Sequence, residues 1–119
     1  MGAYLDQPKT EKESSQGEAI ETLGLVYSSC SMQGWRRTME DAVAVDACLP
    51  QGEAIFGVFD GHGGKEIALF CSREIVKVFT SLESYSRKDY ELALRECFIA
   101  LDASLSSPDG QAKIIEIAK

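Results

Sequence analysis

Two consecutive glycines, Gly63 and Gly64, separate two kinds of hydrophobic pattern in this chain of 119 residues. Before them, short runs rich in β-branched and aromatic residues are bounded by turn formers, which is typical of strands. After them, apolar residues recur at intervals of three and four, which is typical of amphipathic helices. A chain with strands first and helices afterwards is expected to fold as an α+β protein.

Three segments before the glycines have strand character: residues 25–32, 42–49 and 54–60. The second and third are joined by Pro50-Gln51-Gly52, a typical turn sequence, so we expect them to form an antiparallel hairpin.

A pairing of Leu49 with Glu53 across this turn would set the register of the hairpin. The same register places Asp41 opposite Gly61 at the open end of the hairpin. We therefore expect three carboxylates to converge at this end of the sheet: those of Glu40, Asp41 and Asp60.

Helical spacing predicts one helix over residues 67–82 and a second over residues 90–105. Ser86 and Asp89 resemble a capping box before the second helix. Ser107 and Pro108 offer a cap and a first-turn proline for a third helix.

Composition excludes some classes of function. The net charge of −7 argues against a nucleic-acid surface, which needs clustered basic residues. No run of apolar residues is long enough for a membrane span. Four cysteines lie far apart without a CxxC pair, so we interpret them as free thiols that behave as small buried hydrophobes.

Residues 1–22 are polar and are expected to be a flexible lead-in to a domain over residues 23–119.

The acidic end of the hairpin has the composition of a cation site. Glu40, Asp41 and Asp60 supply carboxylates, and Gly61 leaves its backbone carbonyl accessible to a ligand. Carboxylates this close repel unless a cation neutralises them, and oxygen ligands favour Mg²⁺ or Mn²⁺ over zinc. The alternative is a glycine-rich surface turn beside a solvated acidic pair.

Two further residues add chemistry to this end of the chain. His62, the only histidine, follows the acidic turn and can transfer protons near neutral pH. Arg36 carries a guanidinium fork suited to a bidentate grip on phosphate. Together with a cation, these residue types indicate phosphate ester chemistry.

At these motifs the sequence resembles a known family. Residues 32–42, MQGWRRTMEDA, and residues 58–64, VFDGHGG, are similar to the N-terminal motifs of the metal-dependent protein serine/threonine phosphatases of the 2C type. Residues 1–9, MGAYLDQPK, resemble the opening of animal-type and protist members.

The resemblance implies a fold and a mechanism. The fold is a β-sandwich flanked by helices in α-β-β-α layers, of which this chain holds only the N-terminal strands and helices. Two ions, Mg²⁺ or Mn²⁺, are expected to activate the attacking water, with Asp60, Gly61, Glu40 and Asp41 as the metal-site residues. Arg36 is expected to hold the phosphate, and His62 to protonate the Ser or Thr leaving oxygen of a phosphoprotein substrate.

The same family takes further metal-binding aspartates from a C-terminal half. We therefore expect residues 23–119 to be a truncated part of the phosphatase domain that is inactive alone. A competing hypothesis is a non-catalytic truncated module that binds a protein partner. A simple divalent-cation buffer is a weaker one, because it gives Arg36 and His62 no role.

Location and assembly are less constrained by the sequence. Gly2 follows the initiator Met, but the general acylation motif has Ser or Thr where this chain has Asp6. Myristoylation of Gly2 is therefore expected from the resemblance alone, and it would give weak, reversible membrane binding. A cytoplasmic protein is expected, with nuclear or transient membrane association as alternatives; the oligomeric state is left open.

Overall fold

The computed structural model describes residues 4–119, which form two antiparallel two-stranded sheets, four α-helices and one 3₁₀ helix. The chain divides into two compact units, Met1–Met39 and Glu40–Lys119. Strands and helices occupy separate stretches of the chain, so the expectation of an α+β fold is confirmed.

The first unit is a hairpin of β1 (Lys9–Gln16) and β2 (Ser28–Gly34), with the 3₁₀ helix η1 (Glu21–Leu23) between its strands. Residues 9–16, which the sequence placed in a flexible lead-in, thus form a strand. Strand β1 contains no apolar residue, so it carries no alternating apolar pattern, and every one of its residues is exposed. Its pairing depends on the backbone ladder and on hydroxyl contacts such as that between Ser15 and Ser29 (2.7 Å).

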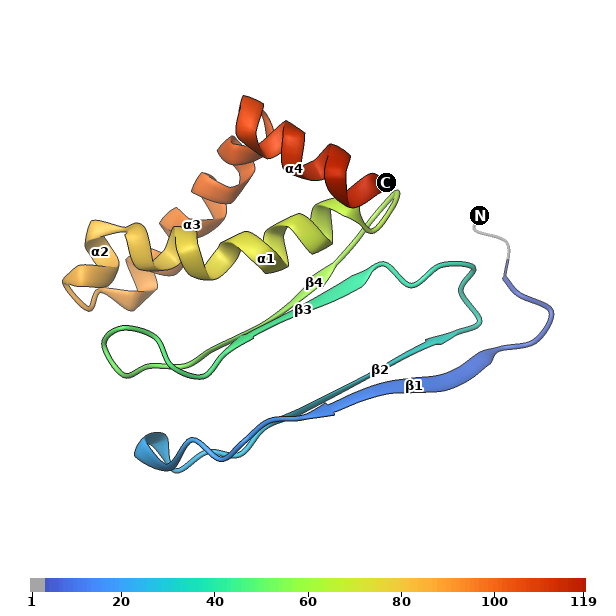
Figure 1. Cartoon of the computed structure of the whole chain (residues 1–119), viewed down its shortest axis with the longest axis horizontal. Coiled ribbons are helices and arrows are strands. Elements are labelled where there is room, and N and C mark those ends of the chain that lie inside the picture. Colours follow the sequence, from blue (N-terminus) through green and yellow to red (C-terminus); the bar gives the residue numbers. More distant parts are fainter. Residues whose placement is uncertain (1–3) are drawn as a thin grey trace. The chain divides into compact units, whose positions relative to one another are not determined.

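The second unit contains the expected hairpin, made of β3 (Asp41–Asp46) and β4 (Ile55–Asp60). Figure 1 shows helix α1 (Glu66–Ser81) running along these two strands. Ala42 and Ala44 are buried, whereas Val43 and Val58 are exposed by 45% and 71%. The sheet therefore buries one face against α1, and its other face is apolar and open to solvent.

The register of this hairpin differs by one residue from the expected one. Leu49 does pair with Glu53 through a backbone hydrogen bond of 2.9 Å, but Asp46 pairs with Ile55 and Asp41 with Asp60. One strand thus advances three residues where the other advances two. The extra residue lies in the turn that the Asp46 carboxylate makes with the backbone N–H of Cys48 (2.9 Å).

Glycine is required where β4 passes into α1. Gly63 and Gly64 have φ angles of 72° and 135°, which side chains of L residues rarely adopt. Helix α1 then begins at Glu66, one residue before the start that the spacing of its apolar residues predicted.

The core of the second unit forms where α1 meets the hairpin and the later helices. Its buried members include Ala44 and Leu49 from the hairpin, Phe79 from α1, and Cys97 and Leu101 from α3 (Tyr90–Leu105). A short helix, α2 (Glu83–Ser86), precedes α3 and was not predicted.

The N-cap of α3 is Asp89, whose carboxylate accepts from the N–H of Leu92 (3.3 Å). Ser86 instead ends α2, so the expected capping box is wrong. The Ser86 hydroxyl donates a hydrogen bond to the carbonyl oxygen of Leu82, one turn earlier in the chain.

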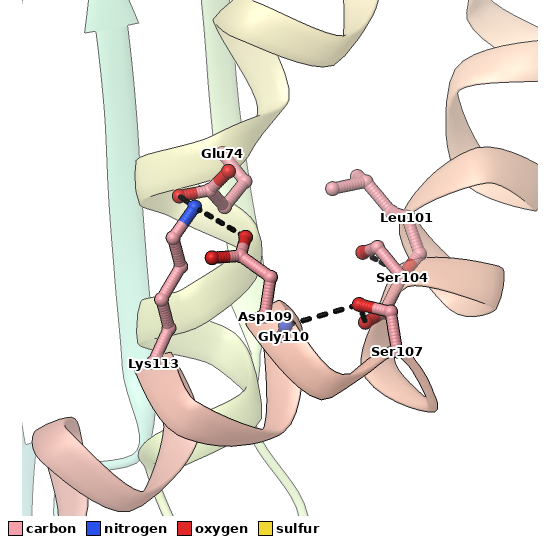
Figure 2. Close-up of polar contacts among 7 residues, drawn as sticks. All are labelled: Glu74, Leu101, Ser104, Ser107, Asp109, Gly110 and Lys113. Carbon is pink, nitrogen blue, oxygen red and sulfur yellow. Dashed lines mark hydrogen bonds and ion pairs between the residues drawn. The ribbon is translucent and has the colours of Figure 1, made fainter.

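Helix α4 (Pro108–Ala118) has the predicted cap, because the Ser107 hydroxyl accepts from the N–H of Gly110 (3.0 Å). Figure 2 shows the same hydroxyl donating to the carbonyl of Ser104 at the end of α3 (2.7 Å). Lys113 joins α4 to α1 through Glu74, at 3.1 Å.

Candidate functional site

The open end of the β3–β4 hairpin carries two opposed aspartates. Asp41 and Asp60 are register partners at the end of the ladder, and both are exposed. Directly opposite residues of an antiparallel pair project from the same face, so both carboxylates lie on the solvent-exposed face of this sheet. The one-residue correction of the register thus brings Asp60, rather than Gly61, opposite Asp41.

Backbone oxygens surround the next residue, Gly61. Its N–H donates to the carbonyl of Glu40 (3.2 Å), which extends the pairing beyond the strands. A Cβ at Gly61 would lie 2.4 Å from the carbonyl oxygen of Glu40 and 2.8 Å from that of Gly64. The space beside Gly61 is therefore bordered by two carbonyl oxygens and open only to a residue without a side chain. The sequence had not indicated the Gly64 carbonyl.

The expected convergence of three carboxylates is not found. Within residues 4–119, no three His, Cys, Asp or Glu side chains are close enough to hold a metal ion. The reason is the alternation of an extended chain: Glu40 and Asp41 are adjacent and project to opposite sides, so Glu40 does not join the Asp41–Asp60 pair. Glu40 is half-buried, whereas Asp41 is exposed.

The His62 ring contacts the backbone of the turn that carries it. Its Nδ1 lies 3.1 Å from the carbonyl oxygen of Asp60 and 4.0 Å from Oδ1 of the same residue. The His62 side chain is 85% exposed. This contact orients the ring through Nδ1, and the exposed side chain is available to a ligand in solvent.

Arg36 belongs to the first unit, beyond the end of β2. Gln33 donates from its amide to the carbonyl oxygen of Arg36 (2.7 Å), which fixes the backbone of the loop. The Arg36 side chain is exposed and therefore available to an anion. Arg36 lies in the irregular segment that follows β2.

Other expectations have mixed outcomes. All four cysteines are free, but only Cys97 is buried; Cys71 is half-buried, and Cys30 and Cys48 are exposed. The interpretation of all four as buried hydrophobes is therefore wrong for two of them. Gly2 lies outside the described residues, and within those residues no helix has the length and apolar character needed to cross a bilayer.

Comparison with known proteins finds similarity over most of the chain. The family model described as "Protein phosphatase 2C" matches residues 25–116. "Probable protein phosphatase 2C 4" of Paramecium tetraurelia is 42% identical over 117 residues, which cover 98% of this chain and 38% of that protein. "Protein phosphatase 1G" of Rattus norvegicus is 39% identical over 121 residues, covering 99% of this chain and 22% of that protein.

Sequence similarity to phosphatases of one class thus extends over nearly the whole chain. The chain belongs to the protein phosphatase 2C family. It spans 38% of the length of the Paramecium relative, so it corresponds to a minority of the residues of that protein.

Proposed function

We propose that this chain contributes part of the catalytic site of a metal-dependent protein serine/threonine phosphatase. The observation that carries the proposal is the family match over residues 25–116, which includes the opposed pair Asp41 and Asp60. Phosphoserine and phosphothreonine residues of proteins are the proposed substrates.

The donor chemistry at the hairpin end fits a hard divalent cation. Asp41 and Asp60 offer carboxylate oxygens on one face, and the space beside Gly61 is bordered by carbonyl oxygens. We assign Asp60, Asp41 and the Gly61 carbonyl to the binding of Mg²⁺ or Mn²⁺, with Glu40 contributing through a bound water. A divalent cation at such a site supplies Lewis-acid activation of water and neutralises phosphate charge.

Two side chains act on the substrate itself. Arg36 holds the phosphate through its guanidinium fork, which matches two phosphate oxygens at once. His62 donates a proton to the departing Ser or Thr oxygen, which is a poor leaving group while it is unprotonated. Its contact with the Asp60 carbonyl holds the ring in place through Nδ1 and leaves Nε2 as the proton donor.

The test is a chimera in which this chain replaces the aligned 117 residues of the Paramecium relative. We expect Mn²⁺-dependent dephosphorylation of a phosphothreonine peptide, about 100-fold or more slower in Asp60→Asn, the range lost with one electrostatic catalytic group. Arg36→Lys is also expected to reduce kcat/KM, because lysine keeps the charge but loses the fork.

Arg73→Lys on α1 is the matched control, since Arg73 is an exposed arginine outside the proposed site. A folded chimera without activity, or one whose activity survives Asp60→Asn, would contradict the proposal. Equal losses in the Arg36→Lys and Arg73→Lys chimeras would contradict the role of Arg36.

A further inference from the structure

Glu53 lies at the turn of the β3–β4 hairpin, at the end opposite to Asp41 and Asp60. The hydroxyl of Tyr85 donates to its Oε2 at 2.9 Å, and the hydroxyl of Tyr90 donates to its Oε1 at 2.5 Å. The backbone N–H of Gln51 in turn donates to the Tyr85 oxygen at 3.2 Å. One carboxylate thus accepts hydrogen bonds from both α2 and α3.

Within the described part of the chain, this carboxylate has no counter-ion. Across residues 4–119, no lysine, arginine or histidine forms an ion pair with Glu53. Burial raises the pKa of Glu53, but hydrogen bonds from Tyr90, the local backbone and Tyr85 outweigh burial, and the net pKa lies below its ordinary value of 4.5. At neutral pH the group is an anion on a half-buried residue.

A cavity of about 350 Å³ opens beside this anion. Aromatic and aliphatic side chains dominate its wall, and Glu53 and Tyr90 supply the polar edge. The wall includes Ile55, Phe56, Phe79 and Leu94. An apolar cavity with one or two polar groups at its edge is the usual form of a small-molecule site.

We propose that this cavity binds a small organic ammonium ion, with the ammonium on Glu53 and an aromatic or branched apolar body among the surrounding rings. A carboxylate that already accepts two phenol hydrogen bonds still has lone pairs for an N–H donor. Aromatic faces add cation–π attraction to the same charge. An anionic ligand is excluded by repulsion from Glu53, and a neutral one gains no ion pair.

The proposal is tested by titrating the ¹⁵N-labelled 119-residue chain with phenethylammonium chloride and following backbone amide shifts. We expect saturable shifts around Glu53, Ala54, Tyr90 and Leu94, with a Kd on the order of 1 mM for a ligand of this size. The neutral analogue 2-phenylethanol, which has nearly the same shape, is expected to bind at least about tenfold more weakly, as is usual when a charge-assisted hydrogen bond is lost.

Glu53→Gln is expected to weaken phenethylammonium binding by about tenfold or more, for the same reason. Glu91→Gln is the matched control, because Glu91 is an exposed acid on α3 that pairs with Arg95 outside the cavity. Leu94→Trp fills the cavity from its half-exposed rim and leaves the carboxylate intact, so it is expected to abolish the shifts.

Three results would overturn the proposal: no saturable shift in the unmodified chain, equal affinity for 2-phenylethanol, or undiminished binding in Glu53→Gln. If Glu53→Gln loses the dispersed spectrum of a folded protein, Leu94→Trp decides, and retained binding there rejects the cavity as the site.

Discussion

His62 is the residue whose proposed role can be separated most cleanly from the rest of the site. In the chimera, His62→Gln is expected to slow hydrolysis of a phosphoserine peptide by about 10²–10⁴-fold, the usual contribution of a general acid. Hydrolysis of p-nitrophenyl phosphate should slow much less, because its leaving group needs little protonation. Steady-state kcat on the two substrates measures the difference, and equal losses on both would remove His62 as the acid.

Cysteine reactivity tests burial at the same scale. Burial, assisted by Asp102, raises the pKa of Cys71, and burial together with Cys71 raises that of Cys97. Cys30 and Cys48 are exposed. Because the thiolate is the reactive form, iodoacetamide at pH 8 is expected to modify Cys30 and Cys48 at least about tenfold faster than Cys71 and Cys97. Peptide mass mapping over time measures the rates; alkylation of Cys97 as fast as Cys30 would contradict the packing of α1 against α3.

At the scale of elements, the start of α4 depends on two residues. Ser107→Ala removes the cap and is expected to cost about 1 kcal/mol of unfolding free energy. Gly110→Ala is expected to cost more, roughly 1–3 kcal/mol, because a Cβ there would lie 1.9 Å from the carbonyl oxygen of Ser104 and would force α4 away from α3. Urea unfolding measures both.

Ala112→Ser is the control for these variants, since residue 112 is exposed in the same helix. It should change the unfolding free energy by about 0.5 kcal/mol or less. A Gly110→Ala protein as stable as this control would show that α3 and α4 are not packed as closely as the structure has them.

The link between the hairpin turn and α3 makes stability depend on pH. The hydrogen bond to Glu53, together with burial, raises the pKa of Tyr90 to about 12 from its ordinary 10. The folded state thus holds this proton more tightly, and the stabilisation is complete below pH 10 and is lost as the pH rises through about 12. Urea unfolding of the unmodified chain and of Tyr90→Phe, measured from pH 8 to 12, gives the difference between their unfolding free energies. This difference should be constant up to pH 10 and should shrink above it. A difference independent of pH would contradict the Glu53–Tyr90 bond.

For the whole molecule, the distribution of acidic groups leads to a prediction about the chain alone. Residues 4–119 contain no set of three metal-ligating side chains, and a two-metal centre needs several carboxylates to hold its ions about 3.5–4 Å apart. We expect the 119-residue chain to bind Mn²⁺ weakly and to show no turnover of a phosphothreonine peptide. Calorimetry and a phosphate-release assay, run beside the chimera, measure both. Mn²⁺-dependent turnover that disappears in Asp60→Asn would show that this part of the site suffices.

The sequence by itself determined most of the elements. Helix α1, the β3–β4 hairpin and the Ser107 cap follow from side-chain spacing and turn chemistry within a few residues, which are local properties of the chain. The proposed site residues were also evident, because glycine and acidic residues gather in two short motifs.

Only the tertiary structure decided how these parts pair. Strand β1 has no buried face, so no periodicity marked it, and its partner β2 lies beyond an intervening turn. The side-chain turn at Asp46 shifted the hairpin register by one residue, which set Asp60 opposite Asp41. Glu53 meets Tyr85 and Tyr90 across more than thirty residues of sequence. Such contacts depend on how distant segments pack together, and a local pattern of residues carries no record of that.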